Sequence, residues 1–297
     1  MDNSKRLTQS YIALTIGFII LGFSPILIKL ANAPGIITSF YRLSTGTLVL
    51  TIPFLYSFIK NKQKLPAKGV LIAALAGVCF ASDMALWTTG IMFGNATLPT
   101  LTGNMAPLWV GIGAIFLFKE RQKTGFWIGL FLAFSGIFIM ILKDFIHPTG
   151  LFKGMMFGLF AGMFYAGYYL FTQPGRKYLN TISFLYISTL STSIMLGIYA
   201  IIFGLKFTGY SQETWTLFIV MGVVVQAGGW FLINFSQGYL PASMVAPTLL
   251  FQPVISGIIE WFMPGGRLTI MYIIGGIIVV TGIYLVHFSR NRTSSGK

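Results

Sequence analysis

Long runs of apolar residues, separated by short polar segments, extend along the whole chain. Ten of these runs are about 20 residues long, which is enough for a helix to cross a bilayer. Their expected bounds are 10–31, 37–59, 69–92, 96–118, 125–143, 151–172, 182–204, 214–236, 242–262 and 269–288. Proline and glycine, which favour turns, occur in most of the breaks. The pattern predicts an all-α polytopic membrane protein with ten transmembrane helices.

The composition points to the same class of protein. Of the 297 residues, 55% are hydrophobic and 9% are charged, whereas a soluble domain has about 25% charged residues. Most of the surface must therefore face a lipid bilayer. A net charge of +14 would suggest nucleic-acid binding in a soluble protein, but here the positions of the cations explain it, so we expect no nucleic-acid partner.

The cations predict an orientation in the membrane. If the N-terminus is cytoplasmic, fourteen of the 20 lysines and arginines lie in cytoplasmic segments and four lie in outer segments. The other two, Lys29 and Arg42, lie inside predicted helices. Because cytoplasmic loops carry an excess of Lys and Arg, we expect both termini in the cytoplasm.

The two halves of the chain resemble each other. At a constant offset of 146 residues, Pro107 aligns with Pro253 and Gly136 aligns with Gly282, and 46 consecutive positions align without a gap. An ungapped alignment that pairs two prolines within predicted helices is hard to explain by apolar composition alone. The sequence therefore contains an internal repeat.

The repeat predicts two units of five helices, residues 1–147 and residues 148–297, in one transmembrane domain. Five is an odd number, so the second unit enters the membrane upside down relative to the first. Inverted repeats of this kind are typical of secondary transporters, in which one bundle rocks against another.

Two stretches carry a family resemblance. In "LGFSPILIKLANAPGIITSFYRLSTGTLVL", Lys29, Pro34 and Arg42 match a pattern of lysine, proline and arginine. In "APLWVGIGAIFLFKER", a proline-containing fourth helix is followed by Glu120 and Arg121. With its length and repeat, the chain resembles the ten-helix EamA-type members of the drug/metabolite transporter superfamily.

The resemblance covers nearly the whole chain, with two departures. The second half has "PGGR" where the first has "KER", and Leu21 stands where the family often has tryptophan. The resemblance implies movement of small metabolites such as amino acids, often as export, in the cytoplasmic (inner) membrane of a prokaryote. It does not define a single substrate.

Four polar residues are expected at a similar depth in the membrane, from the first four helices: Lys29, Arg42, Asp83 and Asn104. An ionised carboxylate at the centre of a helix costs about 2.5–3.5 kcal/mol on insertion scales, so Asp83 should face the interior or a wet cavity. Asp83 either forms a structural ion pair with Arg42 or Lys29, or contacts substrate or a transported proton. The two cations could instead extend to the outer interface.

Five more residues are candidates for substrate contact because they lie on the faces of predicted helices that turn inward. Aromatic rings would pack an apolar part of the substrate and an amide would bind a polar group, although plain packing is the alternative. These residues are Trp87, Tyr165, Tyr169, Trp230 and Gln252.

Pro107 and Pro253 are candidate hinges, because proline in a helix removes a hydrogen bond and permits a bend. Ordinary kinks that do not move are equally consistent with the sequence.

The sequence contains none of the common catalytic motifs. H-E-x-x-H, G-x-S-x-G, a P-loop and a Cys/His cluster are all absent, and the chain has one cysteine, Cys79, and two histidines. We therefore expect no enzyme and no cofactor or metal.

The leading hypothesis is a secondary transporter for small polar or amphipathic metabolites, with amino acids and export favoured. Proton coupling through Asp83 stays open. The main alternative is uptake of another metabolite such as a nucleobase or nucleotide-like compound; a channel and an intramembrane enzyme are less favoured alternatives.

Overall fold

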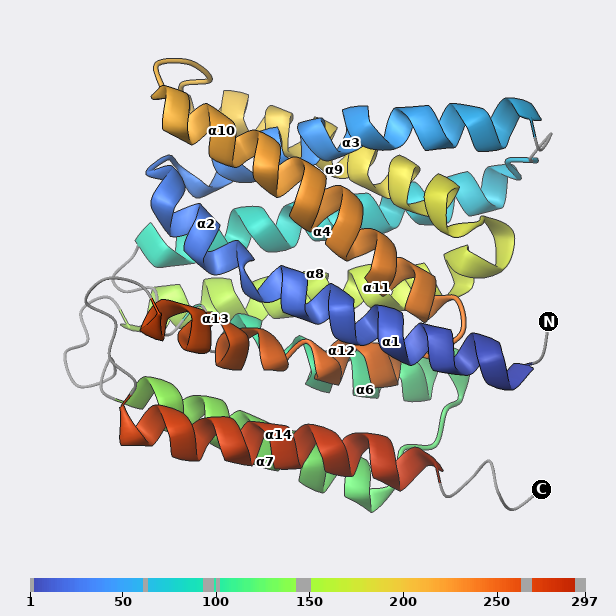
Figure 1. Ribbon diagram of the computed structural model, residues 1–297, viewed down its shortest axis with the longest axis vertical. Helices are drawn as coiled ribbons and strands as arrows, with labels where there is room; N and C mark the ends of the chain where they lie inside the picture. The colour runs from blue at the N-terminus through green and yellow to red at the C-terminus, as the bar shows by residue number, and fades with distance from the viewer. Residues whose placement is uncertain are drawn as a thin grey trace.

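The computed structural model describes residues 3–60, 64–92, 99, 102–142, 151–262 and 269–291. Regular structure in this part of the chain is helical throughout, with no strand. Figure 1 shows the helices packed side by side in one bundle, with both chain termini at the same end.

The first half contains six described helices. They are α1 (Asn3–Gly22), α2 (Ser24–Ala31), α3 (Gly35–Lys60), α4 (Ala67–Met92), α6 (Ala106–Phe118) and α7 (Thr124–Ile141).

The second half contains eight described helical segments. They are α8 (Leu151–Tyr178), α9 (Thr181–Ile202), α10 (Gln212–Val220), the π-helix η2 (Met221–Gly229), α11 (Trp230–Gln237), α12 (Ala242–Thr248), α13 (Phe251–Trp261) and α14 (Ile270–Asn291).

Eight helical spans among the described residues are long and apolar enough to cross a membrane, and two shorter apolar helices, Ala106–Phe118 and Thr124–Met140, coincide with the remaining predicted runs. The prediction of an all-α polytopic membrane protein is therefore confirmed.

Several spans that the sequence predicts as single helices are interrupted. The first divides into α1 and α2 at Phe23, and the ninth divides into α12 and α13 at residues 249–250. In the fourth, turn residues 104–105 precede α6. Interruptions at membrane depth are tolerated only where the backbone is buried in protein or lines a cavity, so they direct attention to the interior of the bundle.

The two candidate hinge prolines do not lie in the middle of helices. Pro107 is in the first turn of α6, and Pro253 is in the first turn of α13. Proline is tolerated there because the first N–H groups of a helix have no intrahelical acceptor. The expectation of a mid-helix position was wrong in both cases, since each proline follows a break in the helix.

Glycines hold α7 and α14 in close contact, and Figure 1 shows these two helices side by side. A Cβ atom on Gly136 would lie 2.5 Å from the carbonyl oxygen of Gly275, and one on Gly129 would lie 2.6 Å from that of Gly282. The repeat aligns Gly129 with Gly275 and Gly136 with Gly282, so aligned glycines meet crosswise. A two-fold axis between the units would produce this arrangement.

The division into two repeats stays a prediction. Its boundary, between residues 147 and 148, lies outside the described residues.

Gly275 and its neighbour Gly276 provide a matched pair of substitution sites, because only Gly275 lies in the close contact. A Cβ on Gly275 would lie 2.5 Å from a backbone oxygen, whereas one on Gly276 would lie 3.5 Å from Val254, an ordinary contact. We expect Gly275→Ala to lower the melting temperature in detergent by about 5 °C, because the helices must separate. Gly276→Ala should leave it unchanged or raise it slightly. Equal melting temperatures would contradict the close approach.

Candidate functional site

Two of the interrupted spans, the fourth and the ninth, meet at a small cavity in the bundle. Residues of the fourth span, Asn104, Ala106 and Pro107, form one part of its wall, and residues of the ninth span form another. The cavity has a volume of about 20 Å³, enough for a single water molecule. The remaining lining residues are Tyr165, Tyr169, Ala246, Leu249, Leu250 and Gln252.

Tight turns carry the backbone through both breaks. The amide of Met105 donates to the carbonyl of Thr102 at 3.1 Å, and the amide of Leu249 donates to that of Ala246 at 3.1 Å. Bonds between residues i and i+3 are typical of a 3₁₀ turn. They give amides at the breaks an acceptor within the protein, so these amides need no bond to water. The helices α6 and α13 begin directly after these turns, which places their positive dipole ends beside the cavity.

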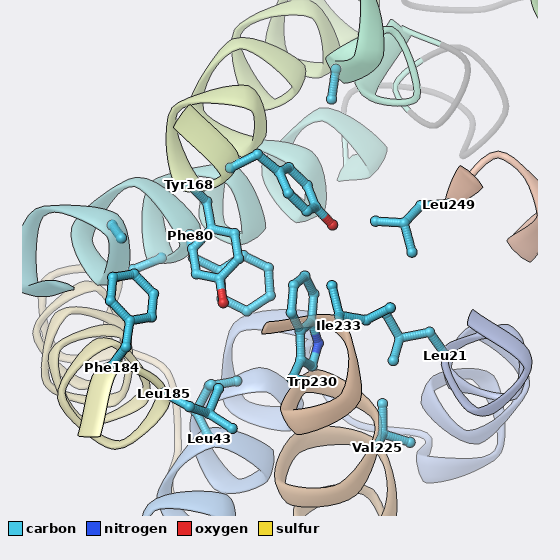
Figure 2. Packing of buried hydrophobic residues seen from close by; sticks show 14 of the residues in the cluster. Leu21, Leu43, Phe80, Tyr168, Phe184, Leu185, Val225, Trp230, Ile233 and Leu249 are labelled. Carbon is cyan, nitrogen blue, oxygen red and sulfur yellow. The ribbon is translucent and has the colours of Figure 1, made fainter. Parts of the chain in front are cut away.

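Five aromatic residues, Phe80, Tyr165, Tyr168, Tyr169 and Trp230, form an aromatic cluster next to this cavity. The Trp230 ring centroid lies 4.8 Å from that of Phe80 and 5.1 Å from that of Tyr168, and Figure 2 shows these three residues together. The hydroxyl of Tyr169 donates to that of Tyr165 at 3.1 Å. Both tyrosines also line the cavity, so the cluster and the cavity are continuous.

Arg42 lies buried in the bundle with its donors only partly used. Its side chain is 4% exposed, and its Nη1 donates to the hydroxyl of Ser24, the first residue of α2, at 3.2 Å. Its Nε is buried without a hydrogen-bond partner. A guanidinium has five N–H donors and a buried unpaired donor is costly, so Arg42 is poorly satisfied by the protein itself.

Asp83, in the middle of α4, is half-buried near Arg42. The two charges are close enough to interact electrostatically, and both also interact with Tyr165. Among the described residues, however, no hydrogen bond or ion pair joins Asp83 to Arg42. The structure therefore does not show the ion pair of Asp83 with Arg42. The side chain of Lys29 lies outside the described part of the structure.

The structure brings most of the other predicted site residues together. Asn104, Tyr165, Tyr169 and Gln252 share the cavity wall, and Trp230 joins them through the aromatic cluster. Trp87 lies beside the break in the fourth span, where its Cδ1 would be 3.7 Å from a Cβ atom on Gly103.

Three residues of this region, Phe80, Tyr168 and Ser24, were not among those predicted from the sequence. Phe80 precedes Asp83 by less than one helical turn, so spacing alone could have included it. Tyr168 lies 100° around the helix from Tyr169, and Ser24 is one helix away from Arg42. No local pattern indicates their contacts.

Comparison with known proteins identifies the family. The model of the EamA-like transporter family matches residues 8–142 and, separately, residues 152–288. The chain belongs to the EamA-like transporter family. It is therefore a transporter and not an enzyme, as the sequence predicts.

The relatives of this EamA-like transporter are distant. The riboflavin transporter ImpX of Fusobacterium nucleatum is 24% identical over 249 residues, covering 80% of this chain and 82% of that protein. An S-adenosylmethionine uptake transporter of Rickettsia prowazekii is 23% identical over 265 residues, covering 87% and 85%. A solved crystal structure aligns with a TM-score of 0.81 at 12% identity, covering 95% of this chain and 99% of that one, which shows the fold alone.

A second polar site lies at the end of the bundle where the chain termini lie. Oxygen Oε1 of Glu120 accepts a bond from the Gln173 amide at 3.1 Å, and Oε2 accepts one from the Ser243 hydroxyl at 2.8 Å. Gln173 in turn accepts a bond from the amide of Ala242 at 2.7 Å. We call these four residues the Glu120 network. It joins the fourth, sixth and ninth spans.

A cavity of about 170 Å³ adjoins the Glu120 network. Residues 120–123 and Ser243 line it, together with Phe126, Met244, Val286 and Ser289. It shares Ser243 with the network. The cavity between the two breaks, called the central cavity below, is lined further along the ninth span, by Ala246, Leu249, Leu250 and Gln252.

Arg176 provides a contrast to Arg42. Its guanidinium donates to the carbonyl of Asn234 at 3.0 Å, to the hydroxyl of Thr181 at 2.6 Å and to the carbonyl of Leu179. The guanidinium of Arg176 is thus well hydrogen-bonded within the protein, whereas that of Arg42 is not.

This contrast predicts effects of different size on stability. Arg176→Met should reduce the free energy of unfolding by roughly 3 kcal/mol, because it leaves buried carbonyls without donors. Arg42→Met should change it by less than about 1 kcal/mol, because removing a poorly satisfied buried charge is often neutral. Melting temperatures of the purified variants measure this. An equally large loss for Arg42→Met would identify Arg42 as a structural counterion of Asp83.

Proposed function

We propose that this EamA-like transporter carries small amphipathic metabolites, with amino acids favoured, by alternating access. The observation that supports this most is the pair of opposite charges, Arg42 and Asp83, that lie near each other in the interior without an ion pair between them. A zwitterion offers a carboxylate to Arg42 and an ammonium group to Asp83. The aromatic cluster would then pack the apolar part of the substrate.

The remaining candidate residues complete this proposal. Asn104 and Gln252 would bind polar substrate groups from the cavity wall, Trp87 would cover its rim, and Lys29 would add positive charge at similar depth. With two cations and one carboxylate, the site would favour substrates that carry a carboxylate.

Transport would require the bundle to open on alternate sides. A cavity of about 20 Å³ is too small for an amino acid, so binding must be accompanied by rearrangement. The breaks before Pro107 and Pro253 are the proposed hinges, because tight turns between half-helices can change angle more easily than a continuous helix.

We propose that the end with the termini faces the cytoplasm of a prokaryotic cell, as the distribution of Lys and Arg predicts. The common position of the two termini (Figure 1) supports an even number of crossings. Export is the favoured direction, and proton coupling through Asp83 is part of the proposal.

The alternative is uptake of a nucleobase-like or nucleotide-like compound. Two relatives are named for riboflavin and S-adenosylmethionine, and both compounds contain planar heteroaromatic rings. The aromatic cluster is compatible with such a ring.

Flux into liposomes tests the function. Purified protein should transport at least one labelled amino acid faster than empty liposomes take it up, with saturation. Arg42→Met and Asp83→Asn should each reduce the rate at least about tenfold, because each removes one charged contact with the zwitterion. If coupling uses Asp83, Asp83→Asn should also abolish the dependence on a proton gradient. Flux no greater than that of empty liposomes over all amino acids would refute the amino-acid assignment.

The Glu120 network should act as the cytoplasmic gate. In a Cys79→Ser background, which removes the single cysteine, a reporter at Asn104→Cys can be labelled with a membrane-impermeant thiol reagent in inside-out vesicles. Glu120→Ala should raise the labelling rate at least about tenfold, because it removes the hydrogen bonds that close this end. Arg121→Ala, an exposed neighbour, is the control. Unchanged labelling in Glu120→Ala would exclude the gate.

A further inference from the structure

Three buried side-chain amides in the eighth span have oxygens without partners. These oxygens are Oε1 of Gln226, Oδ1 of Asn234 and Oε1 of Gln237, and the residues are 1%, 0% and 2% exposed. Most buried polar atoms in proteins are hydrogen-bonded. Three unpaired acceptors along one helical span therefore require an explanation.

The nitrogen atoms of the amides fix the direction of these oxygens. Nδ2 of Asn234 donates to the hydroxyl of Tyr168 at 2.9 Å and to the carbonyl of Trp230 at 2.9 Å. Nε2 of Gln237 donates to the carbonyl of Tyr169 at 2.6 Å. Because an amide nitrogen must face these acceptors, the oxygens cannot exchange places with the nitrogens.

Asn234 and Gln237 lie at the edge of the aromatic cluster. With Trp230 they follow a spacing of i, i+4 and i+7 on α11, so all three share one face of the helix. Tyr169, whose carbonyl holds Gln237, also lines the central cavity. The site thus combines two features: aromatic rings, which can stack on a flat group, and acceptor oxygens that have no donor.

The unpaired oxygens count against a purely structural role for these two amides. Leucine in place of either amide would avoid a buried acceptor without a partner, which costs about 1–3 kcal/mol. Polar residues inside a membrane protein are expensive and commonly mark a substrate pathway. A donor supplied by the substrate would satisfy both oxygens.

We propose that Asn234 and Gln237 determine specificity by accepting hydrogen bonds from the ring N–H groups of a planar heteroaromatic substrate. The rings of Trp230, Tyr168 and Tyr169 stack against this part of the substrate, and Arg42 and Asp83 bind its charged groups. The proposal rests on the proposed function, since it assigns the substrate part that occupies the aromatic cluster. Gln226, one to two turns away beside α3, is outside this ring site.

Two pairs of probes isolate the N–H group. L-tryptophan and its benzothiophene isostere differ by replacement of the ring N–H with sulfur, and riboflavin and 3-methylriboflavin differ by methylation of one N–H. Dissociation constants with purified protein should favour the N–H member of at least one pair by about tenfold. Asn234→Leu should reduce this ratio to within about twofold, and Gln237→Met should also reduce it.

Tyr168→Phe is the matched control. It breaks the bond that Asn234 makes to the tyrosine hydroxyl but retains the acceptor oxygen, so it should keep the ratio whatever it does to affinity. Melting temperatures confirm that each variant is folded. If Asn234→Leu does not fold, the ratio in Gln237→Met decides alone.

The outcomes separate this proposal from the proposed function. Equal binding of both members of each pair, no binding of either pair, or a ratio that survives both substitutions would overturn the assignment of Asn234 and Gln237. In each of these cases, saturable flux of leucine or phenylalanine would still support an amino-acid transporter. Absence of any amino-acid flux, together with an N–H preference for riboflavin that Asn234→Leu abolishes, would overturn the amino-acid function and retain the ring site.

Discussion

The structure depends on one constraint: lipid offers no hydrogen-bonding partner, so each polar group must be satisfied within the protein. Many hydroxyls in the bundle follow this rule locally. Thr47, Ser82 and Thr172, for example, each donate to the carbonyl four residues earlier in the same helix. Such hydroxyls are polar in sequence but find their hydrogen-bond acceptor within their own helix.

The same rule makes the exceptions informative. The breaks in the fourth and ninth spans keep their amides bonded through tight turns, so they interrupt the helices without exposing backbone to lipid. The Nε of Arg42 and the amide oxygens of Asn234 and Gln237 have no hydrogen-bond partner in the described part of the protein. These groups lie around or near one aromatic cluster. Arg176, in contrast, shows that the fold can satisfy a buried guanidinium where a structural role requires it.

Close packing of small residues holds the first and second halves of the chain together. Helix association in a membrane depends on van der Waals contact, and glycine allows backbones to approach. The crosswise glycine contacts between α7 and α14 tie the last helices of the two halves together. The Glu120 network ties the halves by hydrogen bonds at one end, while the cavity between the fourth and ninth spans remains small.

The sequence by itself determined the ten spans and the membrane environment, because each apolar run has the length that the bilayer requires. Its repeat and local motifs also indicated the family. It also selected Tyr165, Tyr169, Asn104 and Gln252, which share a cavity wall, because the repeat and the depth of each residue could be counted. It could not show that Pro107 and Pro253 begin half-helices, since a proline is compatible with a kink or with a first turn. Only the tertiary structure decided which polar groups lack partners. Phe80, Tyr168 and the pair Asn234 and Gln237 come from three different helices, α4, α8 and α11. A contact between helices depends on their rotation and packing, which no local pattern contains.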